Sequence, residues 1–196
     1  MPTVIFSHTK TQEKEYLNQL LKEKKWFERK NFPAFLPKNK KEIENEIRRK
    51  NESLNKKIIR LRRGWKKIEK DYFQIIEGLQ HRKPLSNYKF HTSRFGPEGK
   101  YGPSNLLFVR LRTQRDNRRA VETIGHELLH LLFSDLFNSK NLNYAEREGM
   151  VDALILETDL RKLFPKYERQ SIGKMRRSLL KSILHKSGRI KNLKKT

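Results

Sequence analysis

The chain has no cysteine, and only 9 glycines and 7 prolines among its 196 residues. Without cysteine there can be no disulfide, thiol nucleophile or cysteine-based zinc knuckle, so a metal would have to be held by histidine and carboxylate groups. No apolar run approaches the roughly 20 residues that cross a bilayer, which argues against a membrane-spanning protein. Val4, Ile5 and Phe6 are too few for the core of a secretory signal, so we expect a cytoplasmic location.

Acidic residues are also scarce, and their distribution is uneven. The chain has 46 Lys and Arg against 22 Asp and Glu, a net charge of +24. Residues 1–86 hold 23 basic and 11 acidic side chains and residues 161–196 hold 13 and 1, whereas residues 87–160 hold 10 of each. Such cationic flanks attract polyanions, so nucleic acid is a candidate partner through phosphate contacts. A solvated, lysine-rich surface is the alternative.

Two helices are predicted in the first half of the chain. A short amphipathic helix covers 11–30, and a longer one covers 40–80. The longer helix carries a heptad seam, which favours either a coiled-coil dimer or a backing helix packed on the following domain. The seam comprises Ile47, Leu54, Ile58, Leu61, Trp65, Ile68, Tyr72, Ile75 and Leu79, with Asn51 at one position.

Strands are expected next, followed by further helices. Apolar and polar residues alternate over 88–93, a Gly- and Pro-rich loop spans 95–103, and a second strand covers 106–112, so the strands are predicted to form a long-looped hairpin. A helix capped by Asp116 or Asn117 should reach about Leu136. Later helices are predicted over 144–163 and 167–185, before a basic tail.

The most specific feature is the segment His126-Glu127-Leu128-Leu129-His130, an H-E-x-x-H motif inside the predicted helix. Its two histidines are one turn apart on one helix face, so both imidazoles can reach a single zinc ion. Glu127 lies beside them and can take a proton from zinc-bound water. The next helix carries Glu148 and Asp152, a carboxylate pair also spaced by one turn.

With these two helices, residues 87–160 resemble the gluzincin branch of the zincin metallopeptidases. The resemblance implies Zn²⁺ held by His126, His130 and Glu148, with Glu127 as general base and Asp152 orienting a ligand imidazole. Glu146 is the rival third ligand, although it lacks the paired aspartate. The metzincin continuation is absent, because Phe133 and Leu136 stand where glycine and histidine are required.

The resemblance also assigns a role to the strand before the motif helix. Residues 107–111 would form the upper rim of the cleft and bind peptide by strand addition, or would be an ordinary core strand. Tyr144, Arg147 and Tyr167 are candidate transition-state stabilisers by their proximity in sequence, and packing or surface roles are the alternative.

The sequence therefore predicts an α+β fold, a minimal zincin-like domain with a small sheet, an active-site helix and a glutamate helix, preceded by long basic amphipathic helices. Its predicted organisation is a basic helical region over 1–83, the catalytic domain over 84–165 and a basic helix and tail over 166–196. The expected function is a zinc metallopeptidase acting on a peptide or protein substrate. The alternative is a non-enzymatic nucleic-acid-binding protein on the same scaffold.

Overall fold

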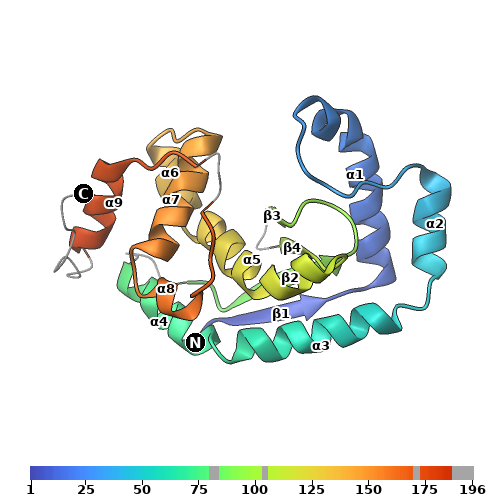
Figure 1. Ribbon diagram of the computed structural model, residues 1–196, viewed down its shortest axis with the longest axis horizontal. Helices are drawn as coiled ribbons and strands as arrows, with labels where there is room; N and C mark the ends of the chain where they lie inside the picture. Colours follow the sequence, from blue (N-terminus) through green and yellow to red (C-terminus); the bar gives the residue numbers. More distant parts are fainter. Residues whose placement is uncertain (80–83, 103–105, 170–172, 187–196) are drawn as a thin grey trace. The chain divides into compact units, whose positions relative to one another are not determined.

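The computed structural model describes residues 1–79, 84–102, 106–169 and 173–186. These residues form the predicted α+β fold, in which a mixed four-stranded sheet is combined with helices (Figure 1). The chain divides into two compact units. The first, here the sheet unit, comprises Thr3–Lys67 and Asn87–Glu127; the second, the helical unit, comprises Met1–Pro2, Ile68–Ser86 and Leu128–Thr196.

The sheet has the order β1-β2-β4-β3, with β1 (Thr3–Ser7), β2 (Asn87–Ser93), β3 (Gly99–Tyr101) and β4 (Leu106–Arg110). Strands β1, β2 and β4 are parallel, and β3 is antiparallel to β4. The predicted hairpin between residues 88–93 and 106–112 is therefore wrong. The segment expected to be only a loop contains β3, which makes the antiparallel pair with β4. Strand β1 was not predicted as a strand.

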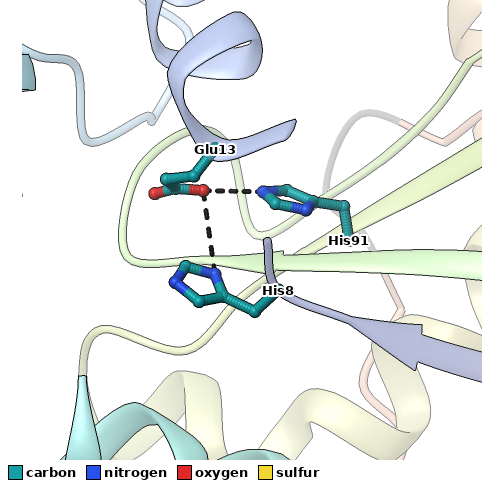
Figure 2. Close-up of side chains that lie close together, drawn as sticks. All are labelled: His8, Glu13 and His91. Atoms are coloured by element: carbon teal, nitrogen blue, oxygen red, sulfur yellow. Dashed lines mark hydrogen bonds and ion pairs between the residues drawn. The ribbon is translucent and has the colours of Figure 1, made fainter. Parts of the chain in front are cut away.

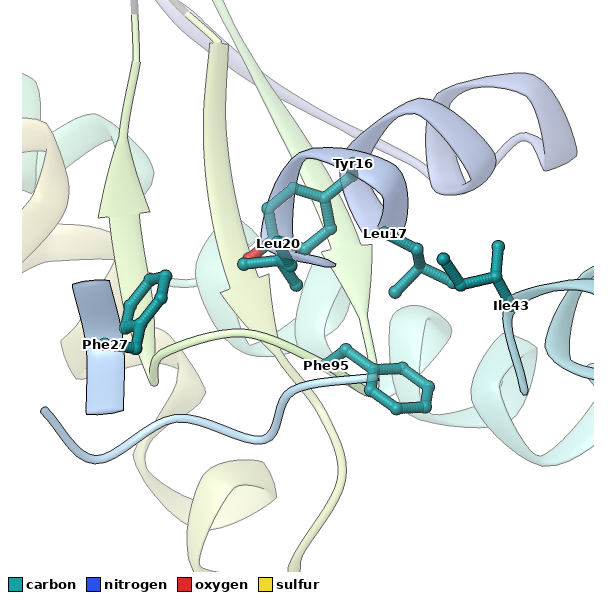
Figure 3. Packing of buried hydrophobic residues seen from close by; sticks show 6 residues of the cluster. All are labelled: Tyr16, Leu17, Leu20, Phe27, Ile43 and Phe95. Atoms are coloured by element: carbon teal, nitrogen blue, oxygen red, sulfur yellow. The ribbon is translucent and has the colours of Figure 1, made fainter. Parts of the chain in front are cut away.

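Helices α1 (Lys10–Arg29) and α2 (Lys40–Arg48) build a core with the loop after β2 (Figure 3). Thr9 caps α1 by accepting a hydrogen bond from the Gln12 N–H, which satisfies one free donor of the first turn. Aromatic and aliphatic side chains fill this core, namely Tyr16, Leu17, Leu20, Phe27, Ile43 and Phe95. Burial of this apolar face explains why the predicted helix over 11–30 forms.

The long helix predicted over 40–80 is three helices: α2, α3 (Glu52–Lys66) and α4 (Glu69–Leu79). Arg49 adopts an extended backbone (φ −64°, ψ 139°), and the Asn51 side chain bonds His8 outside the helix. Tertiary contacts thus override a continuous apolar period. Among the seam residues, those of α3 are buried within the chain, which favours a backing helix over an open coiled-coil seam: Leu54, Ile58, Leu61 and Trp65.

Helix α5 (Gln114–Leu132) begins earlier than predicted, because Thr113 is its cap. The Asp116 N–H donates to Thr113 Oγ1 at 3.0 Å, and the Thr113 N–H donates to Asp116 Oδ2 at 2.8 Å. Arg110 at the end of β4 also donates two hydrogen bonds to Asp116, at 3.0 and 2.8 Å. The start of α5 is thereby fixed to the sheet.

In its described residues, the helical unit contains α4, the end of α5, and four further helices: α6 (Ser134–Ser139), α7 (Tyr144–Leu156), α8 (Leu160–Leu163) and α9 (Arg177–Lys186). The helix predicted to extend to Leu136 ends at Leu132, and the one predicted over 144–163 is broken into α7 and α8. The helix expected from Tyr167 begins only at Arg177. Residues 187–196 of the basic tail lie outside the described part.

Helix α7 is buried from Glu148 through Ile155, so most of its length is enclosed by neighbouring elements. It packs on α8 and α9. None of the helices in the described ranges is both long and apolar enough to span a membrane.

Candidate metal centre

Helix α5 carries the whole H-E-x-x-H motif in its buried last part. His126, Glu127 and His130 are 4%, 8% and 3% exposed. A spacing of four residues places the two imidazoles on the same face, one turn apart. The hydrogen bonds of Thr113 and Arg110 with Asp116 fix the position at which α5 begins. This position helps to determine which residues of the helix face inward.

Helix α7 brings the third group of the predicted set. His130 Nε2 lies 3.3 Å from Glu148 Oε1, and both residues are buried. One ligand atom from each of His126, His130 and Glu148 lies within 4.8 Å of the others. Two imidazole nitrogens and one carboxylate oxygen are a donor set that suits catalytic zinc, so these residues fit the metal that the sequence implied.

Glu146 is engaged elsewhere. It completes a capping box with Asn143 at the start of α7, and its Oε1 accepts from the Arg176 guanidinium at 3.0 and 2.6 Å. The hydrogen bond from the Asn143 backbone and those from Arg176 hold the pKa of Glu146 below its ordinary value. Its carboxylate is thus used in a cap and an ion pair, which favours Glu148 over Glu146 as the ligand.

Asp152 follows Glu148 by one turn of α7 and is fully buried. The Tyr167 hydroxyl donates to Asp152 Oδ1 at 2.7 Å. Of the three candidate stabilisers, Tyr167 therefore contacts the predicted orienting carboxylate. Tyr144 is 52% exposed, and Arg147 donates to Leu142 O and to Asn138 Oδ1, so Arg147 braces the turn before α7.

Gly149 has a role that the sequence did not reveal. A Cβ atom at this position would collide with the backbone of Lys174, whose N–H donates to Ala145 O at 2.7 Å. The segment at Gly173–Lys174 thus crosses α7 in direct contact, and a Cβ atom at Gly173 would lie 3.0 Å from Asp152 Oδ2. Only glycine at position 149 permits this approach.

Strand β3 lies beside Glu127 in the sheet unit. A Cβ atom at Gly99 would come within 2.5 Å of Glu127 Oε1 and 2.6 Å of Thr123 Cγ2. In the strand order, β3 is the terminal strand, whereas β4 is paired on both sides by β2 and β3. The prediction that residues 107–111 form a rim open to strand addition is therefore wrong, because both hydrogen-bonding edges of β4 are already used.

A polar cavity of about 570 Å³ in the sheet unit is a second feature that sequence reasoning missed. Its lining includes four cations, Arg49, Lys57, Arg94 and Arg112, and two acids, Glu42 and Glu46. Burial lowers the pKa of Lys57, and the nearby Arg94 charge lowers it further. These cations come from the residue after α2, from α3 and from the sheet loops, so no local motif could have indicated them.

Comparison with protein-family models, with curated proteins and with solved structures returns no match to this chain.

Proposed function

We propose that the chain is a zinc-dependent metallopeptidase of the gluzincin type, with His126, His130 and Glu148 as the metal ligands. One observation carries this function: the three ligand atoms converge within 4.8 Å in a buried setting. Two successive helices supply the ligands, as the resemblance to gluzincins implies. Two buried imidazoles and a buried carboxylate are donors that a divalent cation of the zinc class would accept.

When bound, zinc would supply a Lewis acid for the scissile carbonyl and lower the pKa of the attacking water. The chain's own task is proton transfer. Glu127 would take the proton of that water on a carboxylate oxygen and deliver it to the leaving amine, so that no covalent enzyme intermediate forms. Asp152 would accept the remaining ring N–H of a ligand histidine and fix its tautomer. Tyr167 would hold Asp152 in place through its 2.7 Å hydrogen bond.

A peptide substrate would lie along β3. This strand ends the sheet and passes Glu127 at Gly99, where no side chain stands between the strand and the carboxylate. An extended peptide added to β3 would gain main-chain hydrogen bonds and bring its carbonyl groups near the proposed base. The rim assigned to residues 107–111 is thereby moved to β3.

The test is Glu127→Gln, assayed with a mixture of quenched fluorescent peptides. We expect it to retain zinc and to lose about 10²–10⁴-fold in hydrolysis rate, because the amide cannot accept the proton. Glu122→Gln, five residues earlier on α5, is the matched control and should cleave normally. Full activity in Glu127→Gln would exclude this mechanism.

The polar cavity supports a second candidate function, nucleic-acid binding through phosphate contacts. Arg112 is exposed and lies over the rings of Phe35 and Phe95, at 4.5 and 5.4 Å, which holds its guanidinium at the cavity. Titration of labelled single-stranded and duplex DNA at several salt concentrations tests this function. Arg112→Ala should weaken binding and reduce the salt slope by about 1, whereas Lys14→Ala on α1 should not. DNA binding that changes neither with salt concentration nor in Arg112→Ala would reject this second function.

A further inference from the structure

A second histidine–glutamate cluster lies wholly in the sheet unit (Figure 2). His8 follows β1, Glu13 lies in the first turn of α1, and His91 lies in β2. Glu13 and His91 are each 1% exposed, and the His8 side chain is 8% exposed. The parallel register pairs Ser7 with His91, so the residue after β1 is brought next to β2.

All three side chains converge on one oxygen. Glu13 Oε2 lies 2.6 Å from His91 Nε2 and 4.0 Å from His8 Nδ1. One ligand atom from each residue lies within 4.8 Å of the others. Ser93 Oγ donates to the other oxygen, Glu13 Oε1, at 2.8 Å and so fixes the carboxylate with Oε2 facing the two imidazoles.

Metal binding through these nitrogens would change the tautomer of both rings. His8 Nδ1 lies 2.7 Å from Thr92 O, and its Nε2 lies 3.0 Å from Asn51 Nδ2. These contacts are those of a ring that carries its proton on Nδ1 and donates it to Thr92 O. On metal binding the proton would move to Nε2, where the Asn51 amide, once turned, could accept it through its oxygen. Among the described residues, none makes a hydrogen bond with the buried His91 Nδ1. A metal on Nε2 would place the ring proton on this nitrogen.

The acidic group of the cluster is a single carboxylate, that of Glu13. In the described chain, the ion pairs of Glu13 are to these two imidazoles, and no lysine or arginine forms one with it. An ionised carboxylate in a low-dielectric interior is stabilised by a positive charge beside it. A divalent cation compensates that charge and uses all three donors at once.

We propose that His8, Glu13 and His91 form a second metal site, which binds a divalent transition ion of the zinc class through His8 Nδ1, His91 Nε2 and Glu13 Oε2. Nitrogen and oxygen donors of this kind suit zinc, and hard cations such as Mg²⁺ prefer oxygen ligands alone. The site does not depend on the proposed peptidase function. Its role would be structural, because the ion would tie β1, α1 and β2 together across about 80 residues of sequence.

Zinc binding by an untagged His130→Ala variant tests the site, since this change removes a ligand of the α5–α7 centre and leaves the cluster intact. After chelation and reloading, we expect about one zinc per chain, and a melting temperature about 5–10 °C higher with zinc than without it. Adding His91→Gln or Glu13→Gln should abolish both. Glu15→Gln, an exposed residue of the same helix, is the matched control for Glu13→Gln.

A His130→Ala chain that folds but binds no zinc would overturn the second site. Unchanged zinc in a folded His130→Ala, His91→Gln chain would also overturn it. The native chain separates the two metal proposals: about two zinc ions per chain, one lost with each variant, would support both. Zinc lost only with His91→Gln would support the cluster and contradict the α5–α7 centre, and zinc lost only with His130→Ala would do the reverse.

Discussion

The two histidine–glutamate clusters offer the same donor types but are built in different ways. At the α5–α7 centre, two of the three residues share one helix, so the local spacing of His126 and His130 already places them together. In the sheet unit, His8, Glu13 and His91 come from a strand end, a helix and a second strand, and the sheet register brings them together. A donor set that suits zinc can thus be marked by a short motif in one region and leave no local pattern in another.

The supporting contacts differ as well. In the helical unit, Glu148 and Asp152 stand on α7, and the Gly173–Lys174 segment crosses that helix at Gly149. In the sheet unit, Ser93 and Asn51 contact the cluster directly. A change on α7 should therefore leave the cluster of His8, Glu13 and His91 intact. The substitutions below examine the two regions in turn.

The largest effect is expected from Gly149→Leu. Its side chain would meet the Lys174 backbone, which cannot move aside as a flexible side chain could. We expect a loss of about 3 kcal/mol or more in the free energy of unfolding, measured by denaturant titration, together with weaker zinc binding at His130 and Glu148. Unchanged stability would show that the segment at Lys174 does not contact α7 in solution.

The next largest effect is expected from Asp116→Asn, which acts on the sheet unit. Burial acts to raise the pKa of Asp116, but its hydrogen bonds with Arg110 and Thr113 and the Arg110 charge outweigh this and lower the pKa. Breaking this buried pair should cost roughly 2–4 kcal/mol at neutral pH. Because the folded pKa is depressed, the contribution is fully present above the unfolded value of about 3.9 and is lost as the pH falls through the folded pKa.

Urea titrations of the native chain and Asp116→Asn at a series of pH values measure that difference. It should be constant near neutrality and shrink below about pH 4. A difference that instead grew as the pH fell would contradict the assigned role of the Arg110–Asp116 pair.

Asp152→Asn is expected to weaken zinc binding about 10–100-fold at the α5–α7 centre, because an orienting partner of a ligand histidine is altered. Competition with a chromophoric chelator measures the affinity. Zinc bound by His8, Glu13 and His91 should be unaffected. An unchanged affinity at the α5–α7 centre would mean that Asp152 serves packing with Tyr167 and not the metal.

The smallest effect is expected from Glu146→Gln. This residue caps α7 and pairs with Arg176, so its loss should change zinc affinity by less than about threefold in the same competition assay. A loss as large as that expected for removal of a ligand would revive Glu146 as the third ligand.

Local patterns in the sequence predicted the elements with strong periodicity. Helix α1 formed as expected, and the apolar seam of α3 is buried. Non-local contacts explain the failures. Parallel pairing of β1, β2 and β4 depends on register over long separations, and the break before α3 accompanies the contact between Asn51 and His8. Neither the parallel pairing nor this break can be predicted from the apolar period of a single sequence.

The features of the candidate site also differ in whether the sequence could predict them. The motif on α5 and the carboxylates of α7 are local patterns, and the structure brings His126, His130 and Glu148 together. The placement of β3 beside Glu127, the close approach at Gly149 and the cluster around Glu13 arise from tertiary structure. Their residues are separated by tens of positions and follow no fixed spacing.

The most direct test of the central claim is the zinc content of untagged protein by elemental mass spectrometry, with Glu148→Ala and His130→Ala compared with the native chain. Convergence of His126, His130 and Glu148 predicts that each variant loses about one zinc ion per chain relative to the native protein. Equal zinc content in all three proteins, or no zinc in the native chain after reconstitution, would contradict a metal centre on α5 and α7.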